Sequence, residues 1–562
     1  MTQVIQEETG QAPILGHTPE SKRNWRKYFT FSTDHKVIGI QYLVSSFFFY
    51  LVGGALATAI RTELATPDVD FVSREVYNGL FTVHATVMIF LWIVPAATGA
   101  FGNYLIPLLI GARDMAFPKL NAVAFWMIPP GGILLLCSFF VGAPGAGWTS
   151  YPPLSLVVNK PGEAIWILSV LLLGTSSILG AVNFLVTLLK MRAPGMTLNK
   201  MPLFCWAMLA TSALILLSTP VLAGALILLA FDLIVGTAFF NPVGGGNPIV
   251  YQHMFWFYSH PAVYIMILPI FGLISEILPV HARKPIFGYK AIAYSSLAIS
   301  FLGLIVWAHH MFTSGTPPWL RMFFMINTMI IAVPTGIKIW SWLATLWGGK
   351  LRLNSALLFG MGFLSMFVIG GISGVMLAAV PFDIHVHDTY FVVAHLHYVL
   401  FGGSVFGLYA ATYHWFPKMS GRMANETLGR IHFALTFIGF NLAFLPMHKL
   451  GLEGMNRRIA EYDPKFATLN FVCTVGTYIL AVSTFPFLFN MVWSIYKGVR
   501  APSNPWSGLT FEWLTTSPPP VENFEVDPVL TIGPYEYGTE EAKEVVAAGP
   551  VLAMVASGLA KA

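Results

Sequence analysis

The sequence predicts an all-α polytopic membrane protein with twelve transmembrane helices. The composition and a series of long apolar runs predict this class. Of the 562 residues, 56% are hydrophobic and 10% are charged, whereas roughly 25% of the residues of a soluble protein are charged. This balance excludes a soluble enzyme. The net charge of +5 is modest for such a chain and does not indicate binding to nucleic acid.

Twelve apolar runs follow one another from Val37, and each is long enough to cross a ~30 Å hydrocarbon core as a helix. Because lipid takes the place of a polar surface, we expect the series to form a single domain over 37–500. The expected helices cover 37–60, 80–110, 121–142, 163–190, 203–231, 250–279, 287–313, 321–347, 354–379, 389–417, 430–448 and 468–496.

The basic residues orient these helices. With an even number of crossings, twenty Lys and Arg side chains flank the helices on the side of the termini, and eight lie on the opposite side. The positive-inside rule then places both termini in the cytoplasm. The N-terminal tail, 1–36, is polar and lacks the pattern of a cleaved signal peptide. The Pro-rich and acidic segment 501–562 is interpreted as a cytoplasmic extension.

Histidine is the metal-binding residue that the sequence favours. Cys137, Cys205 and Cys473 lie far apart in apolar runs, so neither a disulfide framework nor a thiolate metal site is expected. A buried imidazole in a membrane helix needs a partner. A hydrogen bond between helices would explain one such residue as well as metal binding does. It does not explain six: His84, His260, His309, His310, His395 and His397.

His395 and His397 are two residues apart, so at ~100° per residue they point to opposite sides of one helix. Such a helix can supply an axial ligand to a heme on each side, because neutral imidazole is a common heme ligand. Two unrelated polar contacts are the alternative interpretation.

His309 and His310 are adjacent, and adjacent residues bind one ion only if the helix is locally distorted. With His260 they provide three imidazoles, which suit copper, although composition does not separate copper from zinc. Tyr264 follows His260 by four residues on the same helical face, which places a phenol beside the same metal. A membrane tyrosine is more often an interfacial anchor, but Tyr264 lies in the middle of its helix.

These motifs resemble those of the heme-copper oxygen reductases, and the chain is similar to subunit I of the A-type cytochrome c oxidases. The resemblance covers about residues 28–500 and is greatest for the cyanobacterial forms. The segments that carry it are TVHATVMIF (82–90), SHPAVY (259–264), WAHHMFT (307–313) and HDTYFVVAHLHYV (387–399).

The resemblance implies two hemes of type A, one copper, and a magnesium or manganese ion shared with subunit II. Tyr264, joined covalently to His260, would supply an electron and a proton when the O–O bond is cleaved. The implied ligands are His84 and His397 for the low-spin heme, His395 for the high-spin heme, His260, His309 and His310 for copper, Arg61 for the heme formyl, Arg457 and Arg458 for the propionates, and His387 and Asp388 for magnesium or manganese.

Lys338 lies inside the eighth expected helix, where an uncompensated charge costs several kcal/mol. It should therefore line a wet path or be neutral much of the time. The resemblance places this lysine in a proton path called the K-channel and implies a second, the D-channel. The residues that match the two paths are Lys338, Thr335 and Ser275 for the first, and Asp114, Asn121 and Asn183 for the second.

The chain departs from the common family pattern at Ala262, where many A-type enzymes have a proton-carrying glutamate. Tyr258 lies four residues earlier on the same face, and Ser259 follows it. The pair resembles the glutamate-free A2 variant, in which hydroxyl groups and water replace the carboxylate.

The resulting hypothesis is a terminal respiratory oxidase that reduces O2 to water with four electrons from cytochrome c or a similar soluble donor, coupled to proton pumping. Its location would be a bacterial plasma or thylakoid membrane. The chain lacks the C-x-x-C-H motif of c-type hemes and any paired-cysteine copper motif, so subunits II and III are expected partners.

Three alternatives remain open. A quinol oxidase shares these ligands and differs mainly in subunit II. A nitric oxide reductase fits Tyr264 and Lys338 less well. A secondary transporter would also have twelve helices, but it would not need six histidines within them at these spacings.

Overall fold

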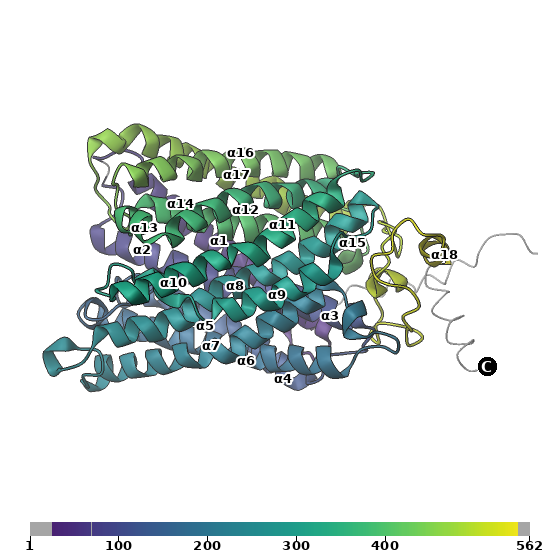
Figure 1. Cartoon of the computed structure of the whole chain (residues 1–562), viewed down its shortest axis with the longest axis horizontal. Helices are drawn as coiled ribbons and strands as arrows, with labels where there is room; N and C mark the ends of the chain where they lie inside the picture. The colour runs from purple at the N-terminus through teal and green to yellow at the C-terminus, as the bar shows by residue number, and fades with distance from the viewer. Residues whose placement is uncertain (1–24, 69, 549–562) are drawn as a thin grey trace, which may run out of the picture.

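The computed structural model describes residues 25–68 and 70–548 as a bundle of helices. Figure 1 shows the helices side by side along the long axis of the molecule, with the C-terminal segment at one end. The described residues form no β-strand. Two isolated β-bridges pair Thr389 with Asn456 and Arg422 with Arg500. The predicted all-helical class is confirmed. Residues 1–24 of the N-terminal tail and 549–562 of the C-terminal extension lie outside the described residues.

Eleven helices in the described part of the chain are long and apolar enough to cross a membrane. Several of them consist of one continuous α-helix, apart from a short 3-10 turn at the start of α17. These are α1 (His35–Glu63), α6 (Lys160–Lys190), α8 (Pro248–Ala282), α12 (Ser355–Ala378), α16 (Glu426–Leu452) and α17 (Ala467–Lys497).

The remaining long helices are composite. In most of them, α-helical parts are joined by π-helical, 3-10 or non-helical residues. The exception is α7, which is one α-helix with a π-helical turn at its end. The parts are α2 (Arg74–Thr86) with α3 (Asn103–Ile110), α4 (Pro118–Trp126) with α5 (Ile128–Cys137), α7 (Leu203–Ala230), α10 (Pro318–Ile330) with α11 (Ala332–Leu346), and α14 (Tyr390–Val399) with α15 (Phe406–Ser420). Two short helices, α13 (Val380–Val386) and α18 (Glu540–Ala548), lie outside them.

The seventh expected helix, 287–313, is not continuous, and this corrects the predicted boundaries. Its residues form α9 (Tyr289–Gly303), a break at 304–306 and a 3-10 helix at Trp307–Met311. At 1.5 Å per residue, α9 is roughly 22 Å long, which is shorter than a ~30 Å hydrocarbon core. The number of twelve crossings therefore stays a prediction.

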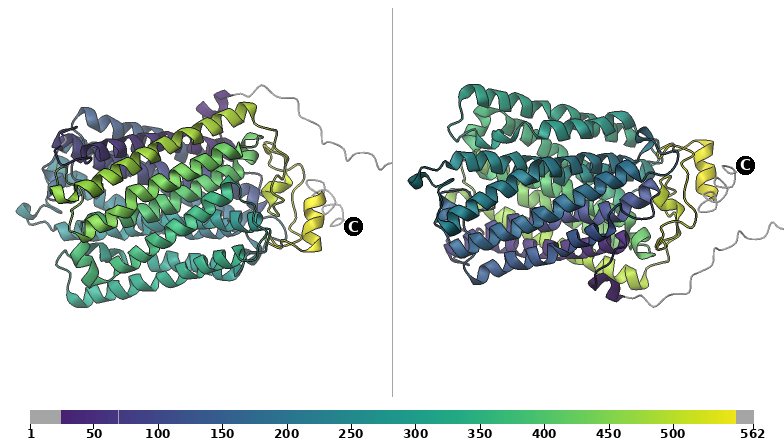
Figure 2. Two further views of the ribbon diagram at one scale, coloured as in Figure 1. Left: turned by 90° about the horizontal axis from the view of Figure 1, so that it is seen from above. Right: turned by 90° about the horizontal axis from the view of Figure 1, so that it is seen from below.

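The first and last parts of the described chain lie at the same end of the bundle (Figure 2). His35 at the start of α1 lies with its Nε2 3.0 Å from Oδ1 of Asn523 in the C-terminal segment. The ammonium group of Lys36 donates to the carbonyl oxygen of Val521 at 2.9 Å. An even number of crossings brings two chain ends to one side, whereas eleven crossings would separate them.

Helix α8 lies at the centre of the bundle, and most of its residues are buried. It starts at Pro248, a residue whose fixed φ suits the first helical turn, and the side chain of Asn247 caps the backbone N–H of Ile249 at 2.9 Å. It packs against α7, α9, α11, α12 and α15. This central position lets side chains of α8 meet groups from several neighbouring helices.

Candidate metal centre and proton paths

Three histidines form a cluster in the interior of the bundle. His260 lies on α8, and His309 and His310 lie on the 3-10 helix that follows α9. One nitrogen from each ring can be chosen so that the three atoms lie within 4.8 Å of one another. The 3-10 winding is a local distortion of the kind that two adjacent side chains need in order to bind one ion.

Neighbouring side chains hold the cluster in place. The Nδ1 of His309 lies 2.9 Å from the hydroxyl oxygen of Thr328, and that hydroxyl donates to the carbonyl of Phe324. The hydroxyl must therefore accept from Nδ1, which leaves Nε2 of His309 free to bind a metal. The indole of Trp256 lies flat on the His310 ring, with 3.7 Å between the ring centroids. Sequence reasoning missed Thr328 and Trp256, because neither spacing nor motif marks them.

Tyr264 lies beside His260, as the spacing of four residues predicts. Their ring centroids are 4.8 Å apart, and the rings are inclined at 68°. The Nε2 atom of His260 is buried and has no hydrogen-bond partner. Gly303 leaves room for the phenol, since a Cβ there would lie 2.8 Å from the ring of Tyr264. The cluster therefore combines three imidazoles with one phenol, without a thiolate or carboxylate.

His395 and His397 of α14 point to different surroundings, as predicted. His395 lies near enough to interact electrostatically with both His260 and His309. His397 instead faces His84 of α2, with 6.5 Å between the ring centroids and an angle of 10° between the planes. Gly374 admits His395, because a Cβ there would lie 2.9 Å from its Cε1 atom.

These three histidines share one hydrogen-bond pattern. Their Nδ1 atoms lie 2.8 Å from the carbonyl oxygen of Gly53 for His84, 3.0 Å from that of Gly370 for His395, and 2.7 Å from that of Val393 for His397. A carbonyl oxygen only accepts, so each Nδ1 carries a proton and each neutral ring has its lone pair on Nε2. This tautomer leaves Nε2 of each ring available to bind a heme iron. The residues present therefore fit two hemes and one copper.

Arg61 is buried at the end of α1. Its Nη2 donates to the carbonyl and side-chain oxygens of Asn470 and lies 3.2 Å from the hydroxyl of Thr474. Its Nε and Nη1 atoms are buried without a hydrogen-bond partner. A buried guanidinium with unpaired N–H groups fits an additional acceptor such as a formyl oxygen.

Arg457 and Asp388 form an ion pair outside the long helices, with Nε of the arginine 2.7 Å from Oδ1 of the carboxylate. Burial alone would raise the pKa of Asp388, but the charges of Arg457 and His387 hold it below its usual value. Burial would lower the pKa of His387, yet the hydrogen bond at 3.0 Å and the charge of Asp383 raise it. Burial and the neighbouring Arg457 lower the pKa of Arg458 to about 10. Charged groups of both signs therefore meet where the segments around Asp388 and Arg457 come together.

Lys338 is 1% exposed on α11. Its ammonium group donates to the carbonyl of Ile292 at 2.8 Å and to the hydroxyl of Ser296 at 2.7 Å, both on α9. The hydroxyl of Ser275 accepts from Trp342 at 3.0 Å, and Thr335 donates to Ile331 within its own helix. The structure thus gives Lys338 a partner, Ser296, that sequence reasoning missed. No direct hydrogen bond among Lys338, Ser275 and Thr335 is present in the described chain.

Asp114 lies in the loop between α3 and α4. Burial raises the pKa of its carboxyl group to about 6, even though the N–H of Met115 donates to it. The Asn183 side chain binds the backbone of Phe117, and the amide nitrogen of Asn121 is buried without a partner. Polar groups therefore line the side of the bundle next to this loop.

Tyr258 and Ser259 are buried on α8, one turn or less before Ala262. The ring of Tyr258 lies 6.3 Å from that of Phe90, and the Ser259 hydroxyl has no hydrogen-bond partner. An unpaired buried hydroxyl is a group that an ordered water molecule can satisfy.

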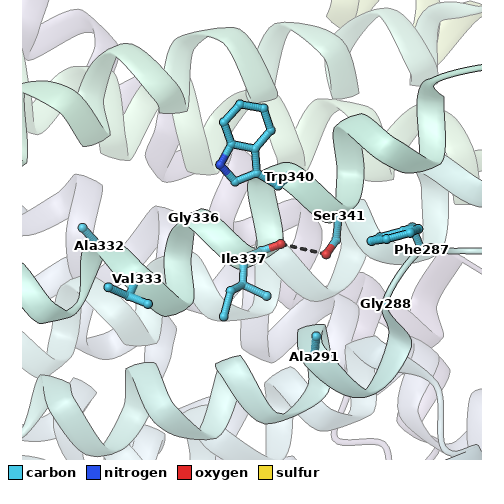
Figure 3. Close-up of a pocket in the computed structure, with 9 residues that line it drawn as sticks. All are labelled: Phe287, Gly288, Ala291, Ala332, Val333, Gly336, Ile337, Trp340 and Ser341. Carbon is cyan, nitrogen blue, oxygen red and sulfur yellow. Dashed lines mark hydrogen bonds between the residues drawn. The ribbon is translucent and has the colours of Figure 1, made fainter.

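A groove of about 510 Å³ lies away from the histidine cluster, between α9 and α11 (Figure 3). Its lining includes Ala291, Gly336, Ile337 and Trp340, and Trp340 is 72% exposed. Lys338 is not among the lining residues. The groove is therefore a feature of the outer, apolar surface of the bundle.

Comparisons with known proteins agree with this arrangement. Residues 37–479 match the family described as Cytochrome C and Quinol oxidase polypeptide I. The chain is 72% identical over 519 residues to cytochrome c oxidase subunit 1 of Synechocystis sp., covering 92% of this chain and 94% of that protein. It is 66% identical over 528 residues to the same subunit of Thermostichus vulcanus, covering 94% of this chain and 96% of that protein.

A solved structure of a heme-copper terminal oxidase dimer has the same fold. It superimposes with a TM-score of 0.70 at 18% identity, over 93% of this chain and all of that chain. Since the family match spans most of the long helices and both relatives are matched almost end to end, the chain belongs to the subunit I family of the cytochrome c and quinol oxidases.

Proposed function

We propose that the cluster of His260, His309, His310 and Tyr264 is where O2 is reduced to water, and that the surrounding helices deliver electrons and protons to it. As a member of this subunit I family, the chain is the catalytic subunit of a heme-copper terminal oxidase, a membrane oxidoreductase of electron transport that reduces O2 and pumps protons. The observation that carries the assignment of the site is the convergence of three imidazole nitrogens within 4.8 Å beside a buried phenol.

The proposed cofactors are two hemes and one copper, which would supply the redox chemistry when bound. His84 and His397, whose rings are nearly parallel, would bind the low-spin heme, and His395, which lies near the cluster, would bind the high-spin heme. The backbone carbonyls of Gly53, Gly370 and Val393 fix the tautomers of these ligands. The two unpaired nitrogens of Arg61 support a heme that carries a formyl group, and therefore heme A.

The chain's own residues would manage the protons. Tyr264 would donate a proton at the centre, next to the unpaired Nε2 of His260. Lys338, Thr335 and Ser275 would form one supply path, with Ser296 as a further member. Asp114, Asn121 and Asn183 would form the other, and Tyr258 with Ser259 would continue proton transfer where the chain lacks a carboxylate.

The proposed partners are subunits II and III, and cytochrome c or another small redox protein. His387 and Asp388 would bind magnesium or manganese with subunit II, and Arg457 with Arg458 would bind the heme propionates, which complement two guanidinium groups. The membrane would be a bacterial plasma or thylakoid membrane, crossed twelve times with both termini in the cytoplasm. The contact between His35 and Asn523 supports the even number of crossings.

Metal content and spectra of the purified oxidase complex test the site. His309→Ala should remove one copper atom per complex and abolish O2 consumption, because the cluster loses one of three ligands. The matched control is His253→Ala, which changes a half-buried histidine of α8 that contacts Trp307 and lies outside the cluster. The assignment fails if His309→Ala keeps its full copper content and activity, or if no heme bands appear in the reduced-minus-oxidised spectrum of the wild type.

Competing donors test the electron source. Cytochrome c should support O2 consumption by the purified complex, whereas a quinol should support it only with a subunit II that binds quinol. A complex that is active with quinol and inactive with cytochrome c would instead identify a quinol oxidase, which the family also includes.

A further inference from the structure

The C-terminal segment covers the end of the bundle where the described chain begins. Residues 503–537 lie at this end of the bundle (Figure 2). They contact α1, α3, α8 and α15, for example through Tyr535, which donates to Glu276 at 2.6 Å. Within the segment, Asn523 is fully buried and has a φ of +66°. Asparagine tolerates this left-handed backbone region better than most residues.

The side chain of Asn523 joins two parts of the chain that are far apart in sequence. Its Oδ1 accepts from the ammonium group of Lys36 at 2.8 Å. Its Nδ2 donates to the carbonyl oxygens of Ala112 at 2.8 Å and Arg113 at 3.1 Å, and lies 2.8 Å from Nε2 of His35. Since Nδ1 of His35 donates to the carbonyl of Asn103, Nε2 of the neutral ring can only accept, so the two N–H groups of Asn523 are shared among three acceptors.

The two carbonyls belong to the residues immediately before Asp114. Residues 112–115 are not helical, so the position of the Asp114 backbone depends on such side-chain contacts. An exposed ion pair at 3.0 Å between Arg113 and Asp527 ties the same loop to the same segment. Asn523 thus sets the distance between this loop and the start of α1.

Charged groups from each neighbouring element face Asp114. Lys36 and Asp34 come from the start of α1, and Glu522 comes from the C-terminal segment. The ammonium group of Lys36 is held by Asn523, by the carbonyl of Val521 and by Asp34 at 3.1 Å. A displacement of Lys36 or of the loop therefore changes both the hydration and the electrostatic surroundings of the Asp114 carboxyl group.

We propose that Asn523 is a positioning residue for proton uptake, which holds the Asp114 loop and Lys36 in the arrangement that lets Asp114 take up protons. The inference rests on the proposed role of Asp114 in one of the two proton paths. It adds a function for the C-terminal segment, which would hold the loop and Lys36 in place at the entrance of this path.

Two substitutions separate the contacts of Asn523. Asn523→Gly removes the side chain while keeping a residue that adopts a positive φ without strain. Asn523→Asp is isosteric and keeps the acceptor for Lys36, but it places a carboxylate oxygen against the carbonyls of Ala112 and Arg113. Asn504→Ala is the matched control, because Asn504 lies in the same segment and binds Gly508.

The readout is the rate and pH dependence of proton uptake by the whole oxidase complex in vesicles under single turnovers. Both Asn523 variants should slow uptake by about tenfold, below the ~100-fold cost of a 1 Å displacement of a reacting group. In Asn523→Gly, the titration near pH 6 should move to lower pH, because a looser loop hydrates Asp114. Heme spectra and uptake in Asn504→Ala should match the wild type.

A second background distinguishes positioning from general stability. In Asp114→Asn, which should itself slow uptake, adding Asn523→Gly should have no further effect on this path. Equal slowing in both backgrounds, or normal uptake in both Asn523 variants while Asp114→Asn is slow, would overturn the inference and leave the proposed path intact. Normal uptake in Asp114→Asn would overturn the path and the inference together. If the Asn523→Gly complex does not assemble with both hemes, the rate of proton uptake in the isosteric Asn523→Asp variant tests the inference instead.

Discussion

The protonation of individual imidazoles is settled by groups that do not themselves bind a metal. His84, His395 and His397 each donate from Nδ1 to a backbone carbonyl. His309 donates from Nδ1 to the hydroxyl of Thr328, whose own proton is donated to the carbonyl of Phe324. The pattern leaves Nε2 free in all four rings. A backbone carbonyl cannot be removed by substitution, so the tautomer of the three candidate heme ligands is protected by the fold itself.

His395→Ala should remove the high-spin heme signature and leave the low-spin signature. His395 and His397 face different partners across α14, with His84 on one side and the copper cluster on the other. Optical spectra of the purified complex measure both signatures. Equal loss of both hemes in correctly folded protein would contradict the assignment of separate ligands.

Lys338→Met should slow turnover strongly while thermal stability changes little. The ammonium group has two oxygen partners, yet an ionisable group inside the membrane is costly to keep, so its removal need not destabilise the bundle. Turnover is measured as O2 consumption, and stability as the temperature of heme loss. If O2 consumption is unchanged, Lys338 is a structural residue that binds α9 to α11.

At the scale of elements, α8 is the helix on which the proposed chemistry depends. It carries His260 and Tyr264 at the cluster, Tyr258 and Ser259 before them, and Ser275 further along. The C-terminal segment is the second such element. It packs against the end of α8 through Tyr535 and against α15 through Glu512, so the two elements are coupled.

Tyr258→Phe combined with Ser259→Ala should lower turnover or pumping, and adding Ala262→Glu should partly restore it. The pair supplies the hydroxyl groups next to Ala262, and the Ser259 hydroxyl is buried without a partner. Proton uptake and ejection in vesicles under single turnovers measure the effect. Ser212→Ala, which removes another unpaired buried hydroxyl on α7, is the control. Normal rates and pumping in the double variant would assign the pair to packing alone.

Glu512→Gln should make docking of the C-terminal segment less dependent on pH. Burial raises the pKa of Glu512 to about 7, although Thr510 donates to it at 2.8 Å. Its pKa in the unfolded chain is 4.5, so the docked state binds more protons between pH 4.5 and 7. The contribution of Glu512 to the stability of the docked segment therefore falls as pH rises through this window, by up to roughly 3 kcal/mol, and is constant above it.

Hydrogen exchange over residues 503–537 between pH 4 and 9 measures this contribution as the difference in protection between the wild type and the glutamine variant. The control is Glu536→Gln, at an exposed glutamate of the same segment that accepts from Gly533. A wild-type segment whose exchange protection is constant from pH 4.5 to 7 would exclude a buried titrating carboxyl group at position 512.

At the scale of the whole molecule, both described chain ends meet at one end of the bundle, and the proposed proton path through Asp114 starts there. The fold thereby places the C-terminal segment beside the start of this proposed path, whose other residues, Asn121 and Asn183, come from α4 and α6. Contacts between residues 488 positions apart, such as His35 with Asn523, close this arrangement.

Labelling from either side of a vesicle tests the topology. In a background without Cys137, Cys205 and Cys473, single cysteines in place of Lys27 and Lys497 should react with an impermeant reagent from the same side. A cysteine in place of Lys465, at the other end of the α17 span, should react from the opposite side. Reaction at positions 27 and 497 from opposite sides would indicate an odd number of crossings.

The helical class and the set of candidate ligands followed from the sequence alone. A chain with 10% charge and long apolar runs has to satisfy its backbone within helices in a bilayer, so its class depends on composition and length. Opposite faces for His395 and His397 follow from 100° per residue, as does the condition that His309 and His310 can bind one ion only where the helix is distorted. These features are local, and local spacing predicts them.

Only the tertiary structure decided which groups complete the sites. The break at 304–306, Ser296 beside Lys338, Asn470 beside Arg61 and Thr328 beside His309 have no signature in spacing, because each depends on how separate segments pack. The docking of Asn523 between Lys36 and the Asp114 loop joins the residues that are farthest apart in sequence among these examples. Its partners are distant in sequence, and hydrogen bonds between distant segments exist only once the helices between them have packed.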